Sequence, residues 1–228
     1  MVVLVIGEEN RLMTENRILI DQKQIESRKV YHFVKRFLDI VLSIIGLIVL
    51  SPLIIIIAYK IKKEDNGPIF YKQVRVGKNG RHFEMYKFRS MVINADQLLE
   101  KLKSKNEVAG AMFKMKNDPR VTKIGHFIRE HSLDELPQLV NVLKGDMSLV
   151  GPRPSLPSEV SKYTAYDKQR LYVIPGCTGL WQATERNDVG FNEMVKLDLE
   201  YIRRASLSYD FWIIVKTITI IFKPNGSY

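Results

Sequence analysis

Between Lys35 and Lys63 the chain reads KRFLDIVLSIIGLIVLSPLIIIIAYKIKK, and this segment constrains the fold more than any other part of the sequence. Its apolar core has roughly the length, about 20 residues, that a single helix needs to span a bilayer. Pro52 lies near the middle and lacks the amide that would donate to the carbonyl of Ile48. The hydroxyl of Ser51 can satisfy part of this freed backbone. The sequence therefore predicts a membrane-associated helix that is broken at Ser51 and Pro52.

Basic residues flank this segment on both sides: Arg28, Lys29, Lys35 and Arg36 precede it, and Lys60, Lys62 and Lys63 follow it. Positive residues beside a membrane segment prefer the cytoplasmic side. Length alone favours a kinked transmembrane helix, whereas basic residues at both ends favour a re-entrant helix that returns to the face from which it came. We favour the re-entrant helix. Asp39 is then expected at the level of the lipid headgroups, paired with Arg36 or Lys35.

The charge balance points to an anionic partner. The 228 residues include 35 Lys and Arg against 25 Asp and Glu, which gives a net charge of +10. Such a surplus suits nucleic acid, an anionic membrane face or phosphorylated substrates, and composition does not choose among them. The single cysteine, Cys177, excludes an internal disulfide framework. The four histidines do not show metal-ligand spacing.

After Gly67 the pattern becomes mixed and predicts a β-hairpin. PIFYKQVRVGKNGRHFEMYKFRSM contains two strand-like runs around Asn79-Gly80, a strong signal for a tight turn. Basic residues are interleaved with aromatic residues along it: Lys72, Arg75, Lys78, Arg81, Lys87 and Arg89. Lysines commonly protect an exposed strand edge. The alternative interpretation is a surface that faces phosphates next to the membrane.

Two adjacent carboxylates, Asp134 and Glu135, stand in HSLDELPQL just before a predicted helix. Ser132 and Glu135 fit the S-x-x-E capping box, and on this stretch alone a structural role at a helix start is the favoured interpretation. Pro137 suits the first turn of the helix that continues to Gly145. A helix N-terminus lowers the pKa of a carboxyl group, so the pair is expected to be ionised and suited to nucleophilic attack or metal binding.

Further candidate residues follow in the second half of the chain. Arg153 stands between two prolines in GPRP, where a stiff backbone suits bidentate phosphate recognition. VIPGCTGLWQATERND, which contains Gln182, is either a plain connection or a loop that receives a base or sugar. A predicted helix, NEMVKLDLEYIRRAS, carries Asp198. The apolar stretch 209–224 is too short to span a bilayer and is either an interfacial helix or a core helix.

In this order and spacing, several motifs resemble those of the bacterial sugar transferases, also called monotopic phosphoglycosyl transferases. The resemblance covers nearly everything from Lys35 to Lys223. It rests on KRFLDI with a mid-segment SP, YKFRSM, SLDELPQLVNVLKGDMSLVGPRP, PGCTGLWQ and LDLEYI. ATERND after Gln182 departs from the SGR-like sequence often found there, which bears on sugar or base specificity.

The resemblance implies an enzyme at the cytoplasmic face of the bacterial plasma (inner) membrane. Such enzymes transfer a sugar 1-phosphate from a UDP-sugar to undecaprenyl phosphate, release UMP, and begin capsule or exopolysaccharide assembly. Matched residue by residue, the resemblance implies that Asp134 is the nucleophile of a covalent aspartyl-phosphosugar intermediate. It also implies that Glu135 is the ligand of a required Mg²⁺, and that Lys87, Arg129 and Arg153 bind phosphates, with Asp198 and Gln182 as further candidates at the substrate site.

Residue pattern and resemblance together predict an α+β fold, mostly helical, in a monotopic membrane protein. We divide it into an N-terminal extension of unknown role (1–34), a re-entrant membrane helix (35–63) and a cytoplasmic catalytic domain (64–228) that ends in an interfacial helix. The rival hypothesis is a membrane-tethered module that binds polyanions, or a scaffold without catalysis. We expect no nucleic-acid partner, and the sequence leaves a homodimer open.

Overall fold

The computed structural model describes residues 18–102, 115, 118–184 and 190–222. Within these residues the elements follow in this order: α2 (Gln22–Ser27), α3 (Lys29–Asp65), β1 (Phe70–Val76), η1 (Lys78–Gly80), β2 (His82–Phe88), α4 (Ala95–Leu102), α5 (Lys123–Glu130), η3 (Leu133–Glu135), α6 (Gln138–Lys144), β3 (Ser148–Val150), α7 (Pro157–Val160), α8 (Ala165–Lys168), η4 (Gln169–Tyr172), β4 (Gly176–Thr178), α9 (Leu180–Thr184), α10 (Phe191–Arg204) and α11 (Leu207–Phe222), where η denotes a 3₁₀-helix. The predicted mostly helical α+β composition is confirmed.

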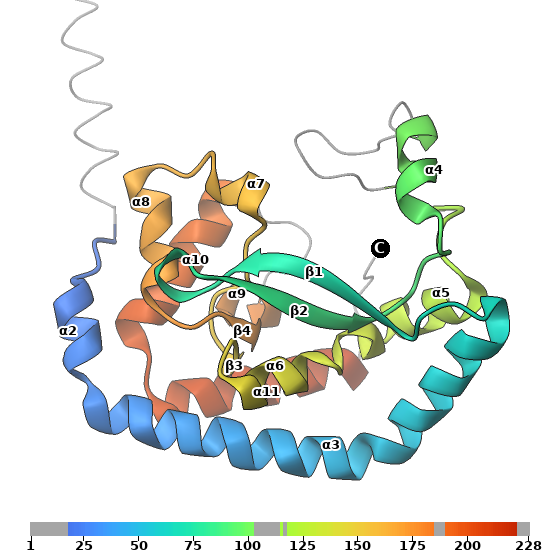
Figure 1. The fold of residues 1–228 in the computed structure, drawn as a ribbon. Helices are drawn as coiled ribbons and strands as arrows, with labels where there is room; N and C mark the ends of the chain where they lie inside the picture. Colours follow the sequence, from blue (N-terminus) through green and yellow to red (C-terminus); the bar gives the residue numbers. More distant parts are fainter. Residues whose placement is uncertain (1–17, 103–114, 116–117, 185–189, 223–228) are drawn as a thin grey trace, which may run out of the picture.

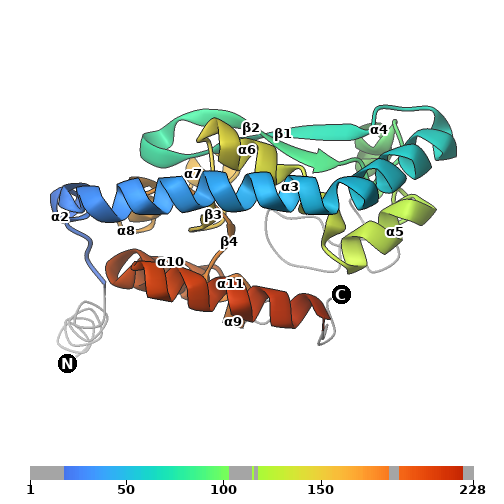
Figure 2. The same ribbon diagram turned by 90° about the horizontal axis from the view of Figure 1, so that it is seen from below.

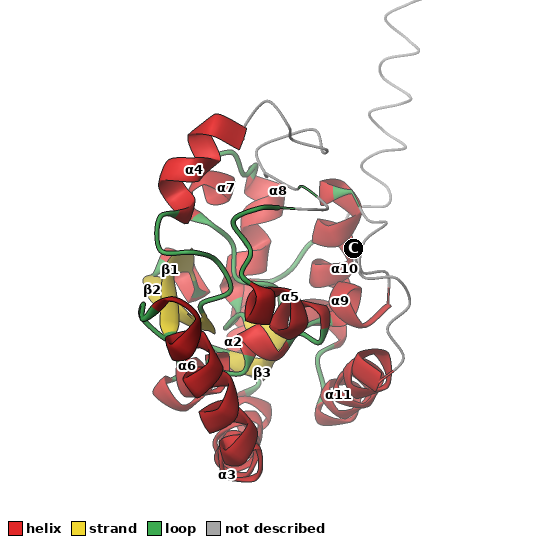
Figure 3. Cartoon of the chain, turned by 90° about the vertical axis from the view of Figure 1, so that its right-hand side faces the viewer, coloured by secondary structure: helices red, strands yellow, loops and turns green. Residues whose placement is uncertain are grey.

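Two helices, α3 and α11, lie along one side of the molecule (Figure 1). Figure 2 views the molecule from that side, and there the two helices run next to each other along its length. The view in Figure 3 places α4, α7 and α8 at the opposite end of the molecule. The two most apolar segments of the sequence therefore share one face, and the polar elements extend away from it.

The long helix α3 continues through Pro52 and changes direction part-way along its length (Figure 1). The hydroxyl of Ser51 donates to the carbonyl of Ile48 over 2.7 Å. This is the carbonyl that a residue other than proline at position 52 would have bonded. The predicted break is thus a bend in a continuous helix. The helix continues because the serine hydroxyl satisfies the carbonyl that the proline leaves free. The helix begins at Lys29 and ends at Asp65, outside the predicted bounds on both sides.

Both halves of α3 pack against the same body. In the first half, the guanidinium of Arg36 donates to the carbonyl of Leu143 at the end of α6 over 2.8 Å. In the second half, the buried Ile57 and Ile61 form a hydrophobic cluster with Phe88 and Ile128. The helix is therefore attached to the folded body on each side of its bend.

The polar residues of the first half of α3 also point into the body. Asp39 is buried and accepts a hydrogen bond from the amide of Leu149 over 3.0 Å. Lys35 pairs with Asp210 at the start of α11 over 2.8 Å. The expected ion pair of Asp39 with Lys35 or Arg36 does not form: Asp39 accepts from a backbone amide within β3, and each cation has another partner.

Part of the predicted N-terminal extension belongs to the packed body. Ile25 of α2 is buried in the main core, and the amide of Ile20 donates to the side chain of Gln169 over 2.7 Å. Residues 1–17 lie outside the described residues. The predicted boundary between residues 34 and 35 falls inside α3.

The predicted hairpin is confirmed. β1 and β2 pair antiparallel, from Phe70 opposite Phe88 to Val76 opposite His82. Asn79 and Gly80 both have positive φ, 54° and 80°, which is the backbone conformation for which these residue types are favoured in tight turns. This hairpin supplies one wall of the candidate site described below.

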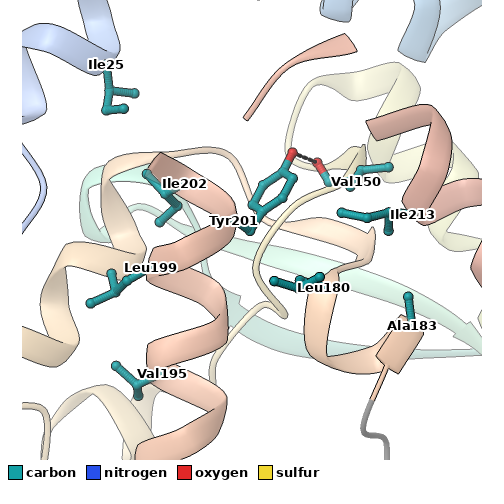
Figure 4. Close-up of a cluster of buried hydrophobic side chains, with 9 residues drawn as sticks. All are labelled: Ile25, Val150, Leu180, Ala183, Val195, Leu199, Tyr201, Ile202 and Ile213. Carbon is teal, nitrogen blue, oxygen red and sulfur yellow. Dashed lines mark hydrogen bonds between the residues drawn. The ribbon is translucent and has the colours of Figure 1, made fainter. Parts of the chain in front are cut away.

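The main core lies between α2, α9, α10, α11 and the short parallel pair β3–β4 (Figure 4). The Tyr201 hydroxyl, at the centre of this core, lies 3.1 Å from the carbonyl oxygen of Val150 and 2.7 Å from the carboxylate of Asp210. Ile213 of α11 is fully buried here, while Phe211 is 68% exposed. One face of α11 therefore packs in the core, and the other exposes apolar side chains; the interfacial helix stays a prediction.

Candidate active site

The two adjacent carboxylates lie in η3, between the end of α5 and the start of α6. Ser132 before them has φ 54° and makes no capping hydrogen bond, so the predicted capping box is wrong. A capping serine needs an extended backbone, and here a left-handed residue turns the chain sharply after α5. Asp134 and Glu135 nevertheless precede the helix α6 closely, as predicted.

Lys87 of β2 reaches both carboxylates. Its Nζ lies 2.6 Å from Oε1 of Glu135 and 3.7 Å from Oδ2 of Asp134. The side chains are 23%, 43% and 13% exposed for Lys87, Glu135 and Asp134 respectively. The structure therefore brings three of the predicted residues together at a partly exposed place.

Asn141 fixes α6 against β2, and sequence reasoning missed it. Its side-chain amide donates to the carbonyl of Glu84 over 2.7 Å and accepts from the amide of Tyr86 over 2.9 Å. Asn141 is fully buried. The side chain of Asn141 thus satisfies two backbone groups of β2 beside Lys87. It thereby sets the distance between that strand and the acid pair.

Burial raises the pKa of the Asp134 carboxyl group above its ordinary value. The positive charges of Lys87 and Arg129 act in the opposite direction, and the neighbouring Glu135 raises the pKa further. The expected lowering by a helix N-terminus is wrong, because desolvation outweighs it. The cations around Asp134 are what favours its ionised, nucleophilic form.

Arg129, at the end of α5, approaches the site from the other side. Its Nε donates to the hydroxyl of Ser90 over 2.8 Å. Ser90 lies two residues after the end of β2, and its carbonyl accepts from the amide of Thr122 over 3.1 Å. A Cβ on Gly125 would lie 2.0 Å from the same carbonyl oxygen, so only glycine permits this approach of α5.

Arg153 lies in a loop that is hydrogen-bonded to β4. The amide of Gly151 donates to the carbonyl of Thr178, and the amide of Gly176 donates to the carbonyl of Pro152, each over 2.9 Å. The Arg153 side chain is partly exposed and lies 3.4 Å from Glu159. These hydrogen bonds to β4 hold the backbone of the loop on both sides of Arg153, in addition to the prolines.

The remaining candidates lie farther inside the body. Asp198 is fully buried and pairs with Arg170 over 2.6 Å. In this placement the carboxylate of Asp198 faces Arg170 inside the body. Gln182 lies in α9, and its buried Oε1 has no hydrogen-bond partner among the described residues. No contact between described residues joins Gln182 to the acid pair.

The acid pair offers a hard, oxygen-only donor set. Among the described residues there is no group of three or more His, Cys, Asp or Glu that would form a cage for a metal ion. Mg²⁺ is commonly held by one or two carboxylates together with water and substrate phosphates. Asp134 and Glu135 therefore fit a magnesium ion that a phosphorylated substrate helps to bind.

Comparison with known proteins identifies the family. The profile described as "Bacterial sugar transferase" matches residues 30–224. The chain belongs to the bacterial sugar transferase family. The predicted resemblance is thereby confirmed, and the match includes α3 and the entire candidate site.

Curated members of this family are similar over most of this chain. The "Galactosyl transferase CpsE" of Streptococcus agalactiae is 46% identical over 96% of this chain and 49% of its own length. The "Undecaprenyl-phosphate galactose phosphotransferase" of Salmonella typhimurium is 46% identical over 89% of this chain and 43% of its own length. This chain thus spans about half of these two relatives. The "Exopolysaccharide production protein ExoY" of Sinorhizobium fredii is 41% identical, with 85% of this chain and 88% of ExoY covered.

Proposed function

We propose that this protein transfers a sugar 1-phosphate from a UDP-sugar to undecaprenyl phosphate, as a first step of capsule or exopolysaccharide assembly. The observation that carries the proposal is the acid pair with Lys87 within 2.6 Å of Glu135 and 3.7 Å of Asp134, in a chain of this family. Phosphoryl transfer between anions needs positioned positive charge more than any other device. The names of three relatives refer to undecaprenyl phosphate together with galactose, N-acetylgalactosamine or glucose.

In the proposed first step, a carboxylate oxygen of Asp134 attacks the phosphorus that bears the sugar. An aspartyl oxygen–phosphorus bond forms, the bond to the bridging oxygen breaks, and UMP leaves with that electron pair. In the second step, an oxygen of undecaprenyl phosphate attacks the same phosphorus and Asp134 is released. A covalent carboxylate intermediate divides one difficult transfer into two easier ones.

The basic residues of the site, Lys87, Arg129 and Arg153, have different roles in this proposal. Lys87 and Arg129 lower the pKa of Asp134, which burial alone would keep protonated over a wider pH range. Both cations also neutralise the phosphate charge that arrives with the donor. Arg153 is the third phosphate-binding residue and is held by its locked loop. A Mg²⁺ ion bound by Glu135 would supply further neutralising charge to the diphosphate.

The packing of α3 supports a re-entrant, monotopic arrangement at the cytoplasmic face of the plasma membrane. α3 is the described helix that is long and apolar enough to cross a bilayer. Because both of its halves contact one folded body, a straight crossing would pull one half away from that body. Large apolar side chains of α3 and α11 are exposed: Phe33, Phe37, Ile48, Ile55, Phe211 and Ile218. This surface would bring the site to the lipid acceptor.

The test is UMP release from UDP-galactose, UDP-glucose and UDP-N-acetylgalactosamine, with undecaprenyl phosphate and Mg²⁺. We expect release with one of these donors, and its loss in Asp134→Asn. The matched control is Asp146→Asn, because Asp146 also lies near α6 and pairs with the partly exposed Lys144 over 3.9 Å. Absence of release with any donor, also from a wider panel of nucleotide sugars, would favour the scaffold or polyanion-binding hypothesis.

A further inference from the structure

Arg75 stands on the same face of the hairpin as Lys87. Cross-strand partners in an antiparallel pair project to one face, and side chains alternate along a strand. Lys87 is opposite Tyr71, and Arg75 is opposite Phe83. Since residues 71 and 75 are separated by an even number of positions, Arg75 and Lys87 face the same way. Lys72 is on the opposite face, where it pairs with Glu84 over 2.9 Å.

The side chain of Arg75 is buried, with 7% of the residue exposed. Its guanidinium donates to the carbonyl of Pro154 over 2.9 Å and to the side-chain oxygen of Gln73 over 2.6 Å. Its Nε is buried and has no hydrogen-bond partner among the described residues. Arg75 also makes no ion pair within that part of the chain, so a full positive charge is held in the body by neutral acceptors alone.

The charge of Arg75 interacts both with residues at the Arg153 loop and with the acid pair. Burial and the like charge of Arg153 lower the pKa of Arg75 to about 10, and the carboxylates of Glu159 and Glu135 act in the opposite direction. Glu159 is already engaged, because it lies 3.4 Å from Arg153 and accepts from the amide of Leu156 over 2.7 Å. Glu135 is engaged as well, by Lys87. Three cations, Arg75, Arg153 and Lys87, therefore face two carboxylates, and this positive excess suits an arriving anion.

The backbone around Arg153 is fixed from the hairpin. Arg75 bonds the carbonyl that follows Arg153, and the amide of Val76 donates to the carbonyl of Ser155 over 2.8 Å. From the other side, the guanidinium of Arg170 lies 3.5 Å from the carbonyl of Arg153. Of the groups that hold the loop, Arg75 is the one that also adds a charge with no ion-pair partner of its own.

We propose that Arg75 is a positioning residue for the diphosphate of the donor. It braces the Arg153 loop through the carbonyl of Pro154, and it adds a second guanidinium charge on that side of the acid pair. This inference rests on the proposed function, because it assumes that a diphosphate binds beside Asp134 and Glu135. Arg75 acts by holding the Arg153 loop and by the electrostatic field of its own charge, and no contact between Arg75 and the substrate is needed.

The test compares the dissociation constants of UDP and uridine, measured on the full chain in lipid nanodiscs with Mg²⁺. We expect Arg75→Gln to weaken UDP binding about tenfold, the equivalent of about 1.4 kcal/mol, and to leave uridine binding unchanged. Arg75→Lys keeps the charge but loses the forked geometry, so its loss should be smaller. Lys72→Gln removes an exposed charge from the other face of the same strand and should bind UDP as the wild type does.

A double variant separates bracing from charge. If Arg75 acts partly through Arg153, the combined loss in Arg75→Gln with Arg153→Gln is smaller than the product of the two single losses. The inference is overturned if Arg75→Gln binds UDP as the wild type does, or if it weakens UDP and uridine equally. Equal weakening would mean a purely structural role, which a lowered unfolding temperature would accompany. A wild-type protein that binds neither ligand would overturn the proposed function as well.

Discussion

Arg170 and Asp198 form an ion pair over 2.6 Å in which each side chain is only 1% exposed. Arg170 also donates to the hydroxyl of Tyr163 over 2.7 Å, and Tyr163 donates to the hydroxyl of Ser155 over 2.8 Å. These contacts run from α10 to the residue that follows the GPRP loop. Asp198 therefore supports the Arg153 loop from inside the body.

Asp198→Asn should lower the free energy of unfolding by about 3–5 kcal/mol, because a buried guanidinium loses its counter-ion. The matched control is Glu200→Gln on the same helix, where an exposed pair joins Glu200 to Arg204 over 2.9 Å. Such a surface pair contributes only about 0.3–0.5 kcal/mol. Denaturant unfolding at neutral pH measures both. Equal effects of the two substitutions would refute the supporting role of the buried pair.

Asn141→Ala should lower the free energy of unfolding by about 2–4 kcal/mol, because the partly buried carbonyl of Glu84 and amide of Tyr86 in β2 lose their partner. It should also lower turnover, since α6 then no longer holds the acid pair at a fixed distance from Lys87. Val140→Ala provides the comparison, because Val140 lies on the same helix and is 39% exposed. Wild-type turnover in a destabilised Asn141→Ala protein would argue against this docking role.

The pH profile of kcat/KM should have an acidic limb above the ordinary range of an aspartate, about 3.9. Asp134 must be ionised to attack, and burial raises its pKa, so activity should rise with pH through that raised pKa. Lys87→Met removes a charge that lowers this pKa, and the limb should therefore move to higher pH. Lys144→Met, which removes an exposed charge from the far end of α6, should leave the limb in place. A limb that stays fixed in Lys87→Met would show that another group controls it.

Cysteine labelling tests the path of α3 through the membrane. Lys29→Cys and Lys63→Cys, each in a Cys177→Ala background, place a thiol at an exposed position near each end of the helix. A re-entrant helix predicts that a membrane-impermeant thiol reagent labels both positions in inside-out vesicles and neither in intact cells. Labelling of one position from each side would establish a transmembrane crossing.

Local patterns predicted the elements around the site well. The hairpin followed from Asn79 and Gly80, whose positive φ angles are a local property of residue type. The bend in α3 followed from Pro52, and even the compensating hydroxyl of Ser51 was visible as a neighbour in sequence. The order of Asp134, Glu135 and α6 was predictable for the same reason.

Properties that depend on tertiary packing were not predictable. The capping box failed because the turn after α5 places Ser132 in a left-handed conformation. The pKa of Asp134 moves opposite to expectation because burial is set by the elements packed around it. Asn141 and Arg75 make contacts with residues far away in the sequence. Asn141 is one polar residue in an apolar run and carried no local signal of its role. Arg75 was one of six basic residues in the predicted hairpin, and nothing in the sequence distinguished the buried Arg75 from the exposed Lys72.

The most direct test of the central claim is the mass of the intact protein after reaction with its UDP-sugar and Mg²⁺, without the lipid acceptor. The account predicts one UMP released per protein chain and a mass increase of one sugar phosphate, with both absent in Asp134→Asn. Addition of undecaprenyl phosphate should then restore the original mass. An unmodified protein that still turns over with both substrates, or an adduct that persists in Asp134→Asn, would contradict the account.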